Sequence, residues 1–303
     1  FVVNANFSGS LPFRIASEAI DFNIGAEYRK EKGAFTPDAI LSQPSSLLGF
    51  TFVAPYAGAK GSFHTKEIYG ELSVPLVSPD QDWPVIKSLS VEGAARYVDH
   101  SLAGGDLTWS AGGRFSPRLP GIGDGLQFRG VYTRSIRSPG ITELFSGASP
   151  TRGALNDPCD RIRYQEGNNP TVRAANCAAA LQAFGTTPAS FVSTTAGVSP
   201  VGTISGNPNL ENEKARSWSA GVVYQPTAIP GLRLAADWSE IKLTGGIQRL
   251  AIGNLLEACY DSANFPNEPS CDAFRRLSAS ETGPGTANPI RIAGDIADGY
   301  NSG

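Results

Sequence analysis

The segment YTRSIRSPGITELF, Tyr132–Phe145, carries an arginine and a glutamate where an alternating aromatic and polar pattern ends. An arginine side chain can bind a carboxylate through two parallel hydrogen bonds, a geometry that lysine does not provide. We therefore expect Arg137 to pair with Glu143 or Glu213 and to fix the root of a long loop, 139–214. The alternative is that Arg137 only faces water.

Four cysteines are the other residues whose spacing suggests chemistry, and they allow three disulfide pairings. We favour the local pairing, Cys159–Cys177 and Cys259–Cys271, because it closes two short loops. The other two pairings and four unpaired thiols are the alternatives. Disulfides would indicate an oxidising compartment. A zinc site is weakly supported, since no C-x-x-C spacing is present.

Catalytic, metal and nucleic-acid sites find little support in the sequence. His64 and His100 lie far apart along the chain, so we expect no metal site and no cofactor. No G-x-S-x-G or phosphate-cradling motif occurs, and the carboxylates Glu211 and Glu213 lie beside a strand, so we expect no enzyme. The net charge of -3, without a visible Lys/Arg cluster, argues against nucleic-acid binding.

The bulk composition is unusual for a soluble globular chain. Charged residues make up 17% of the 303 residues, whereas about 25% is typical. The 34 glycines and 22 prolines indicate many turns. No run of about 20 apolar residues exists, so no transmembrane helix is expected. Methionine is absent and the C-terminal segment DIADGYNSG ends without a closing element, so we expect a section of a longer polypeptide.

Period-two alternation is the dominant pattern along the chain, and it predicts antiparallel β-strands. A further candidate strand lies near Phe1–Phe7. The alternating windows are 20–30, 68–76, 89–97, 107–115, 126–137, 218–224 and 232–238.

The two faces of these predicted strands differ in charge. The apolar face carries only Lys30 and Arg134. A charge facing lipid at the middle of a bilayer costs roughly 2–4 kcal/mol, so this face suits hydrocarbon and the polar face suits water. The residues expected to face an aqueous lumen are Glu27, Arg29, Glu71, Glu92, Arg96, Arg114, Arg129 and Arg137, with Asp21, Arg233 and Asp237 on the same face.

Aromatic residues near strand ends and the lengths of the links also favour a membrane barrel. The long links are 34–63, 139–214 and 251–293, and they fall at one end; the short links 79–85, 117–125 and 226–231 fall at the other, with the short link 101–106 as an exception. Outer-membrane barrels show this bias. We therefore expect an all-β chain that forms about eight strands of an antiparallel transmembrane β-barrel. A soluble, secreted, carbohydrate-binding β-sandwich is the alternative, because its strands also alternate.

Two motifs give the pattern a more specific interpretation. The segment YTRSIRSPGITELF resembles a motif of TonB-dependent outer-membrane receptors, and GNPNLENEKA resembles the start of the next strand in that family. Asn212 stands where the family usually has proline. The residues on the family's fixed positions are Arg137, Pro139, Glu143, Leu144 and Phe145, then Gly206, Asn207, Pro208, Leu210, Glu213 and Ala215. The cysteine-bearing segments are similar to that family's disulfide loops.

The resemblance implies a 22-stranded barrel that is plugged by its own separate domain and imports a scarce solute. Siderophore-bound iron or a carbohydrate is the solute class we expect, and cobalamin and peptide are the alternatives. Import would use the proton gradient through the TonB protein, in the outer membrane of a Gram-negative bacterium. The implied partners are outer-membrane lipid, the plug domain, TonB and a small solute. We find no plug and no TonB-contacting box in this chain, so both contacts would involve other parts of the receptor. A passive porin-like barrel is the alternative.

The long external loops would face the solute. We expect Arg161, Arg163, Tyr164, Asn168 and Asn169 to contact a ligand, and the alternative is that they form an ordinary solvated loop. Short helices are predicted within the loops at 179–185 and 254–260.

Overall fold

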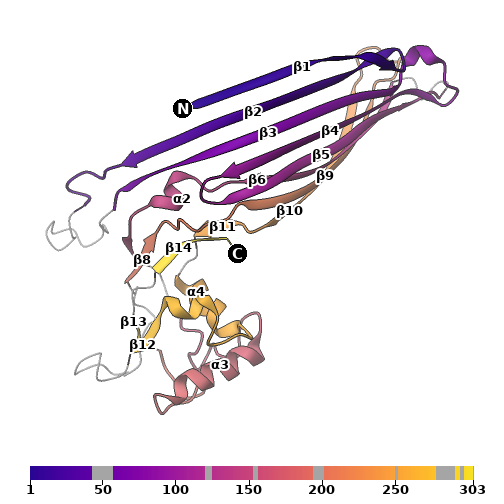
Figure 1. The fold of residues 1–303 in the computed structure, drawn as a ribbon. Helices are drawn as coiled ribbons and strands as arrows, with labels where there is room; N and C mark the ends of the chain where they lie inside the picture. The colour runs from indigo at the N-terminus through magenta and orange to yellow at the C-terminus, as the bar shows by residue number, and fades with distance from the viewer. Residues whose placement is uncertain are drawn as a thin grey trace.

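Eight strands form one antiparallel sheet in the computed structural model, in the order β1-β2-β3-β4-β5-β6-β9-β10 (Figure 1). The structure describes residues 1–42, 57–119, 125–152, 156–193, 201–249, 252–277, 291–293 and 297–302. The strands are β1 (Val2–Ile15), β2 (Glu18–Phe35), β3 (Ala59–Val77), β4 (Ile86–His100), β5 (Gly104–Pro117), β6 (Leu126–Arg137), β9 (Glu213–Tyr224) and β10 (Leu234–Thr244). The predicted fold class and the candidate strand near the N-terminus are confirmed. The sheet is open, with β1 and β10 as its edges.

The strands are longer than the alternating windows from which they were predicted. β2 and β3 have 18 and 19 residues, whereas a tilted transmembrane strand needs about 9–11. β2 runs to Phe35 and β3 begins at Ala59, so their link is 36–58 rather than the expected 34–63. Arg233 was expected on the polar face of a strand, but β10 begins only at Leu234. The preceding turn extends to Leu232, whose backbone N–H donates to the carbonyl of Ile229 at 3.2 Å.

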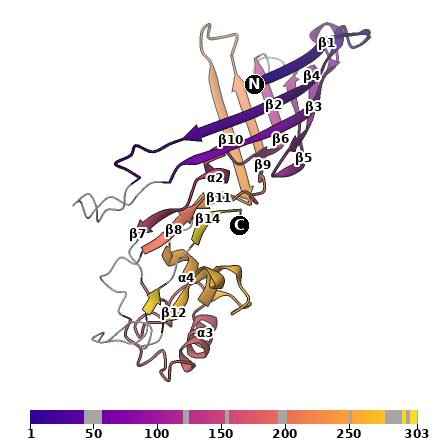
Figure 2. The ribbon, with the colours of Figure 1, turned by 60° about the vertical axis from the view of Figure 1, so that its left-hand side comes forward.

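Short turns join the strands at one end of the sheet, and the long links leave from the other end, which also holds the short β4–β5 turn at 101–103. The short-turn end holds the β1–β2 turn and the 3₁₀ helix Pro79–Gln81 between β3 and β4. At the other end, the chain makes a long excursion between β6 and β9, which are nevertheless hydrogen-bonded neighbours. Figures 1 and 2 show the additional helices and strands gathered beyond this long-loop end.

A short helix after β6, α2 (Ile141–Phe145), distinguishes the two faces of the sheet. Leu144 of α2 packs on Phe63 of β3, so the face that carries Phe63 is the one on which α2 lies. We call it the inner face and the opposite one the outer face. Because side chains alternate along a strand, the register assigns every neighbouring position to one face or the other. All eight charged residues that were expected to face a lumen have inner-face positions.

The outer face is apolar over its middle and its short-turn half, and many of its large side chains there are exposed. The exposed fractions of Leu72, Val91, Trp109 and Trp218 are 44%, 38%, 37% and 56%. A β-sandwich would bury these side chains between two stacked sheets. The described residues contain no second sheet packed on this face, so the sandwich alternative is wrong.

The excursions at the long-loop end form a separate structure with its own core. Helices α3 (Pro170–Gln182) and α4 (Ile252–Asp261) lie there together with the 3₁₀ helix Pro269–Ala273. The smaller strands are β7 (Ser149–Arg152), β8 (Val201–Ser205), β11 (Ile247–Arg249), β12 (Arg275–Leu277), β13 (Arg291–Ala293) and β14 (Ala297–Ser302). α4 contains the helix predicted at 254–260, whereas α3 begins earlier than predicted and ends at Gln182. Among the described helices, none has the length and apolar character needed to cross a bilayer.

Candidate functional site

Arg137, the last residue of β6, lies between two carboxylates at the root of the long loop. Its Nε donates to Glu213 Oε2 at 2.5 Å, and its Nη1 donates to Glu143 Oε2 at 3.0 Å. The sequence offered these glutamates as alternative partners, and the arginine contacts both. Glu143 also accepts from the backbone N–H of Gly140 at 2.7 Å, and Glu213 from that of Ile247 at 2.5 Å. One guanidinium therefore connects β6, β9, α2 and the segment that follows β10.

The second motif packs directly against α2. The backbone N–H of Asn207 donates to the carbonyl of Glu143 at 2.8 Å, and Leu210 joins Leu144 and Phe63 in a buried cluster. A Cβ added to Gly206 would lie 2.6 Å from the backbone nitrogen of Ser146, so only glycine fits at this approach. The two motifs, whose residues Arg137 and Glu213 are 76 positions apart in sequence, thus form one structural unit where the long loop begins and ends.

Asn212 stands where the resembling family motif usually has proline, and its side chain makes a hydrogen bond that proline could not make. Its Nδ2 donates to Asp106 Oδ2 at 2.9 Å, and Asp106 also lies 3.6 Å from Lys214 Nζ. Proline has no side-chain donor and could not make this bond.

Both disulfides have the expected local pairing, Cys159–Cys177 and Cys259–Cys271. They lie in two different loop segments, 156–193 and 252–277, which share one hydrophobic core. We call these two segments together the loop cap. Its buried core consists of Cys159, Cys177, Leu181 and Phe191 from the first segment and Leu255, Leu256 and Tyr260 from the second.

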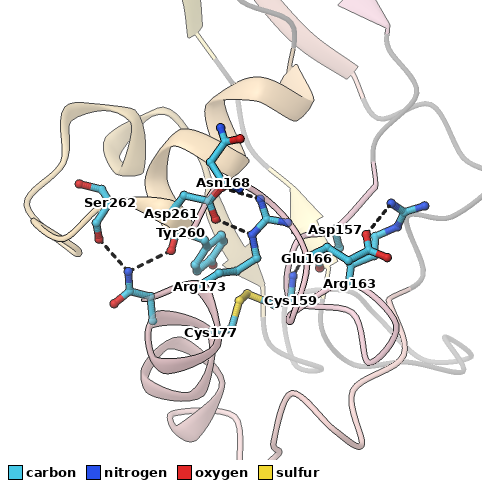
Figure 3. A network of polar contacts seen from close by, with 11 residues as sticks. Asp157, Cys159, Arg163, Glu166, Asn168, Arg173, Cys177, Tyr260, Asp261 and Ser262 are labelled. Carbon is cyan, nitrogen blue, oxygen red and sulfur yellow. Dashed lines mark hydrogen bonds and ion pairs between the residues drawn. A yellow bond between two sulfur atoms is a disulfide. The ribbon is translucent and has the colours of Figure 1, made fainter. Parts of the chain in front are cut away.

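Ion pairs with little solvent contact join the two segments of the loop cap. Arg173 of α3 donates through Nε to Asp261 Oδ1 at 2.5 Å and through Nη2 to Asp261 Oδ2 at 2.7 Å (Figure 3). This hydrogen bonding raises the pKa of Arg173 above its ordinary value. Arg276 binds Asp157 with both terminal nitrogens, at 2.8 Å and 2.7 Å. The side chains of that second pair are only 4% and 1% exposed.

Tyr260 lies beside both ion pairs and is itself buried. Burial raises the pKa of Tyr260, and Arg276 Nε donates to its hydroxyl oxygen at 2.8 Å. Asn176 Nδ2 donates to the backbone carbonyls of Tyr260 and Ser262, at 3.0 Å and 2.8 Å. The Arg276–Tyr260 bond lies within the second segment, whereas the two ion pairs and the Asn176 bonds cross from one loop segment to the other, so the loop cap is one unit made from two loops.

The five residues expected to face a ligand lie close together on the first segment of the loop cap, but in different surroundings. Arg161, Asn168 and Asn169 are exposed. Arg163 lies 3.5 Å from Glu166, and Tyr164 is half-buried against the cap core. The first three side chains are thus accessible to a solute, while the other two also contribute to the structure of the cap.

The inner face of the sheet carries a series of cross-strand ion pairs. Arg96 lies 2.7 Å from Glu67, with its guanidinium 4.5 Å from the ring centre of Tyr69. Arg129 of β6 and Asp237 of β10 meet at 2.6 Å over the strand between them. A Cβ on Gly221 of that strand would lie 2.0 Å from Asp237 Oδ1, so the glycine makes this bridge possible.

Polar side chains also line two shallow hollows of the inner face. One has a volume of about 320 Å³ and the other about 310 Å³. Within the described residues, no group of three or more His, Cys, Asp or Glu side chains is arranged to hold a metal ion.

Sequence reasoning did not find Arg173, Asp157, Asp261 or Arg276. Asp157 and Arg276 are 119 positions apart, and each looks like an ordinary loop charge in its own segment. The only available signal was an indirect one, since both aspartates lie within two residues of a cysteine.

Comparisons with known proteins agree with this geometry. The family described as TonB dependent receptor-like, beta-barrel matches residues 1–270. A mutant of the ferric enterobactin receptor of Pseudomonas aeruginosa, in complex with enterobactin, matches with a TM-score of 0.53 and 12% identity. That match covers 99% of this chain and 31% of the receptor.

The siderophore receptor PirA of Acinetobacter baumannii matches with a TM-score of 0.50 and 12% identity, over 100% of this chain and 32% of that one. This chain therefore spans about a third of the length of these neighbours. No curated protein sequence matches the chain. The family match covers most of the chain, including both motifs, the eight-stranded sheet and most of the loop cap, and on that evidence the chain belongs to the family of TonB-dependent receptor β-barrels.

Proposed function

We propose that this chain is the membrane-spanning and solute-facing part of an outer-membrane receptor that binds a scarce solute and imports it in a TonB-coupled way. The sheet would span the outer membrane of a Gram-negative bacterium, and the loop cap would lie outside the cell. The plug domain and TonB would act through other parts of the receptor. No enzymatic step belongs to this function.

The difference between the two faces of the sheet carries the proposal. An apolar outer face with aromatic rings suits hydrocarbon, and an inner face with paired charges suits a wet lumen. The loop cap lies at the end of the sheet where its long links leave, as expected for the mouth of such a lumen. A plain porin would have the same two faces, and so the coupling to an energy source needs its own test.

Siderophore-bound iron is the solute class that we favour, because the similar solved structures are siderophore receptors. A carbohydrate is the other class, and no described contact favours it. Within the loop cap we assign solute contact first to Arg161, Asn168 and Asn169, because they are accessible and charged or amide-bearing.

The test is uptake by a strain in which this protein, as its gene encodes it, is the only receptor of its class. Radioactive iron would be supplied on single siderophores, and labelled oligosaccharides would be supplied in parallel. We expect uptake of at least one ferric siderophore, and loss of that uptake when the proton gradient is collapsed. Uptake that persists without the gradient would support a passive porin instead.

Paired variants would locate the solute contact. Arg161→Ala with Asn169→Ala should weaken solute binding by about tenfold or more, since each removes a hydrogen bond to a charged or polar group. Arg118→Ala, at the short-turn end, removes a similar charge far from the loop cap and serves as the control. Equal binding by both proteins would remove the loop residues from the proposed site.

A further inference from the structure

A row of three cations crosses the outer face at its long-loop end. Arg134 of β6 lies directly opposite Arg216 of β9, and Arg216 lies directly opposite Lys242 of β10. Like charges in directly opposed positions destabilise a sheet. An anion beside the row, either from this chain or from outside it, would relieve this repulsion.

Within the described residues, two carboxylates lie near the three cations of the row. Lys242 lies 3.2 Å from Glu240, and Arg134 lies 3.8 Å from Asp106, a carboxylate already shared with Lys214. Arg216, in the centre, is exposed and has no ion pair or hydrogen bond within the described part of the chain. The middle of the row is thus positively charged and open.

The neighbouring positions show the depth at which the row lies. One step toward the middle of the sheet, Tyr132 is opposite Trp218, with ring centres 4.6 Å apart, and Tyr132 also contacts Trp109 at 5.0 Å. Aromatic rings of this kind mark the boundary of the hydrocarbon in membrane barrels. The cations lie just beyond that boundary, on the side of the long loops.

The whole outer face shows the same uneven distribution of charge, with its cations toward the long-loop end. At its long-loop half, the register places Lys30, Lys32, Lys60, Lys66, Arg134, Lys214, Arg216 and Lys242 against the acids Asp99 and Glu240. Asp106, at an inner-face position, is a third acid near this group, because it lies within 4 Å of Arg134 and Lys214. At its short-turn half, the positions in unbroken register are uncharged: Ile20, Phe22, Leu72, Val74, Leu89, Val91, Phe115, Phe128, Val222, Tyr224, Leu234 and Ala236. Such asymmetry fits a bilayer whose two surfaces differ in charge.

We propose that Arg134, Arg216 and Lys242 bind the phosphate groups of a lipid headgroup in the leaflet on the long-loop side. Adjacent strands are about 4.8 Å apart, so the row spans about 10 Å, which is enough for two phosphates. The fitting partner is a membrane lipid whose headgroup carries two phosphates. Arginine binds phosphate through its planar fork, and two of the three cations are arginines. The inference rests on the membrane location given under the proposed function.

The experiment measures lipid binding to the protein as its gene encodes it, purified in detergent, by native mass spectrometry. The probes are a diphosphorylated glucosamine-based glycolipid, the same lipid without its phosphates, and inorganic phosphate as a competitor. Arg216→Gln should bind the diphosphorylated lipid about fivefold more weakly, and the triple glutamine variant about a hundredfold more weakly. Arg114→Gln removes an exposed arginine from the inner face of the same sheet and should bind like the wild type.

Three results would overturn the inference: equal affinity for the lipid with and without phosphates, unchanged binding by the triple variant, or displacement of the lipid by millimolar inorganic phosphate. The wild-type comparison of the two lipids needs no variant, so it holds even if a variant fails to fold. A separate arm measures quenching of Trp218 fluorescence by lipids brominated in their chains, with Trp218→Phe as the blank. Absence of quenching would reject the membrane location itself, whereas quenching without a phosphate effect would reject only the cation row.

Discussion

The loop cap and the eight-stranded sheet are stabilised in opposite ways. The loop cap has a buried core, two disulfides and an ion pair with side chains only 4% and 1% exposed. Within the described residues nothing packs over the outer face of the sheet, and the arginines of its inner-face ion pairs are open to water, with Arg96, Arg114 and Arg129 41%, 59% and 48% exposed. The cap therefore carries its own stabilising contacts, while the sheet depends on what surrounds it.

Because of this difference, an ion pair of the same residue types contributes differently to stability in the two regions. A charge pair that water reaches contributes about 0–1 kcal/mol, because solvent and salt screen it. Loss of one partner of a buried pair leaves an uncompensated charge and costs several kcal/mol. Mutations of the same chemical type should thus separate the two regions clearly.

The largest effect is expected for Asp157→Asn in the loop cap. It leaves the buried guanidinium of Arg276 without a counter-charge and should destabilise the cap by about 3–5 kcal/mol. Hydrogen exchange would report this as faster exchange across 156–193 and 252–277, with the sheet unchanged. Arg163→Gln, which removes a half-exposed ion pair of the same cap, is the matched control. Slow exchange in Asp157→Asn would mean that the pair does not join the loops.

Removal of the disulfide between Cys159 and Cys177 should have the next largest effect. The bridge closes a segment with a sequence separation of 18. In the chain-entropy account such a crosslink contributes about 3 kcal/mol. Cys159→Ser with Cys177→Ser should therefore make the cap sensitive to protease while the sheet stays resistant. A protease pattern identical to that of the oxidised wild type would contradict this role.

An arginine introduced on the outer face tests whether that face of the sheet contacts lipid. Ala220→Arg puts a charge on the outer face, one step below the aromatic row, and should cost on the order of 2 kcal/mol. The adjacent Ser219→Arg projects from the inner face and should cost little. The measurement is the free energy of folding into lipid vesicles by denaturant titration. Equal costs for the two neighbours would remove the distinction between a lipid face and a wet face.

Arg137 lies between the two regions, and a substitution there should have an intermediate effect. Arg137→Leu leaves Glu143 and Glu213 without a shared partner, and we expect a loss of about 1 kcal/mol because the guanidinium is 47% exposed. Faster hydrogen exchange at 206–213 would report it. Arg137→Lys keeps the charge but not the fork, so it should restore only part of the protection. Unchanged protection from hydrogen exchange in Arg137→Leu would show that the base of the long loop does not depend on this arginine.

The smallest effect is expected for Arg114→Gln on the inner face. The ion pair with Glu92 is 3.6 Å long and open to water. Its loss should change the free energy of unfolding by less than about 0.5 kcal/mol, by the same vesicle titration. A cost near that of Asp157→Asn would mean that the inner face is dry.

Much of the fold was predictable because alternation is a local property. Ile20, Phe22 and Ile24 show period two without reference to any other strand, and so the strands and their two faces followed from the sequence. The strand ends were less predictable. β9 begins at Glu213 and β10 ends at Thr244, both beyond the apolar windows, since the ends that leave the apolar layer lose the pattern.

The candidate site was predictable only where a motif marked it. Arg137 and Glu143 lie six residues apart in one motif, and the second motif supplied Glu213. The pair Arg276–Asp157 carried no such mark. Nothing in a polar loop segment tells which distant charge will be buried against it.

The sequence by itself determined the strands, the polarity of their faces, the local disulfides and the family. Only the tertiary structure decided which loops meet in the cap and which cations form a row across β6, β9 and β10. The reason is that a side chain's face depends on its own neighbours along the chain. Register and loop docking, in contrast, depend on contacts between residues that are distant in sequence.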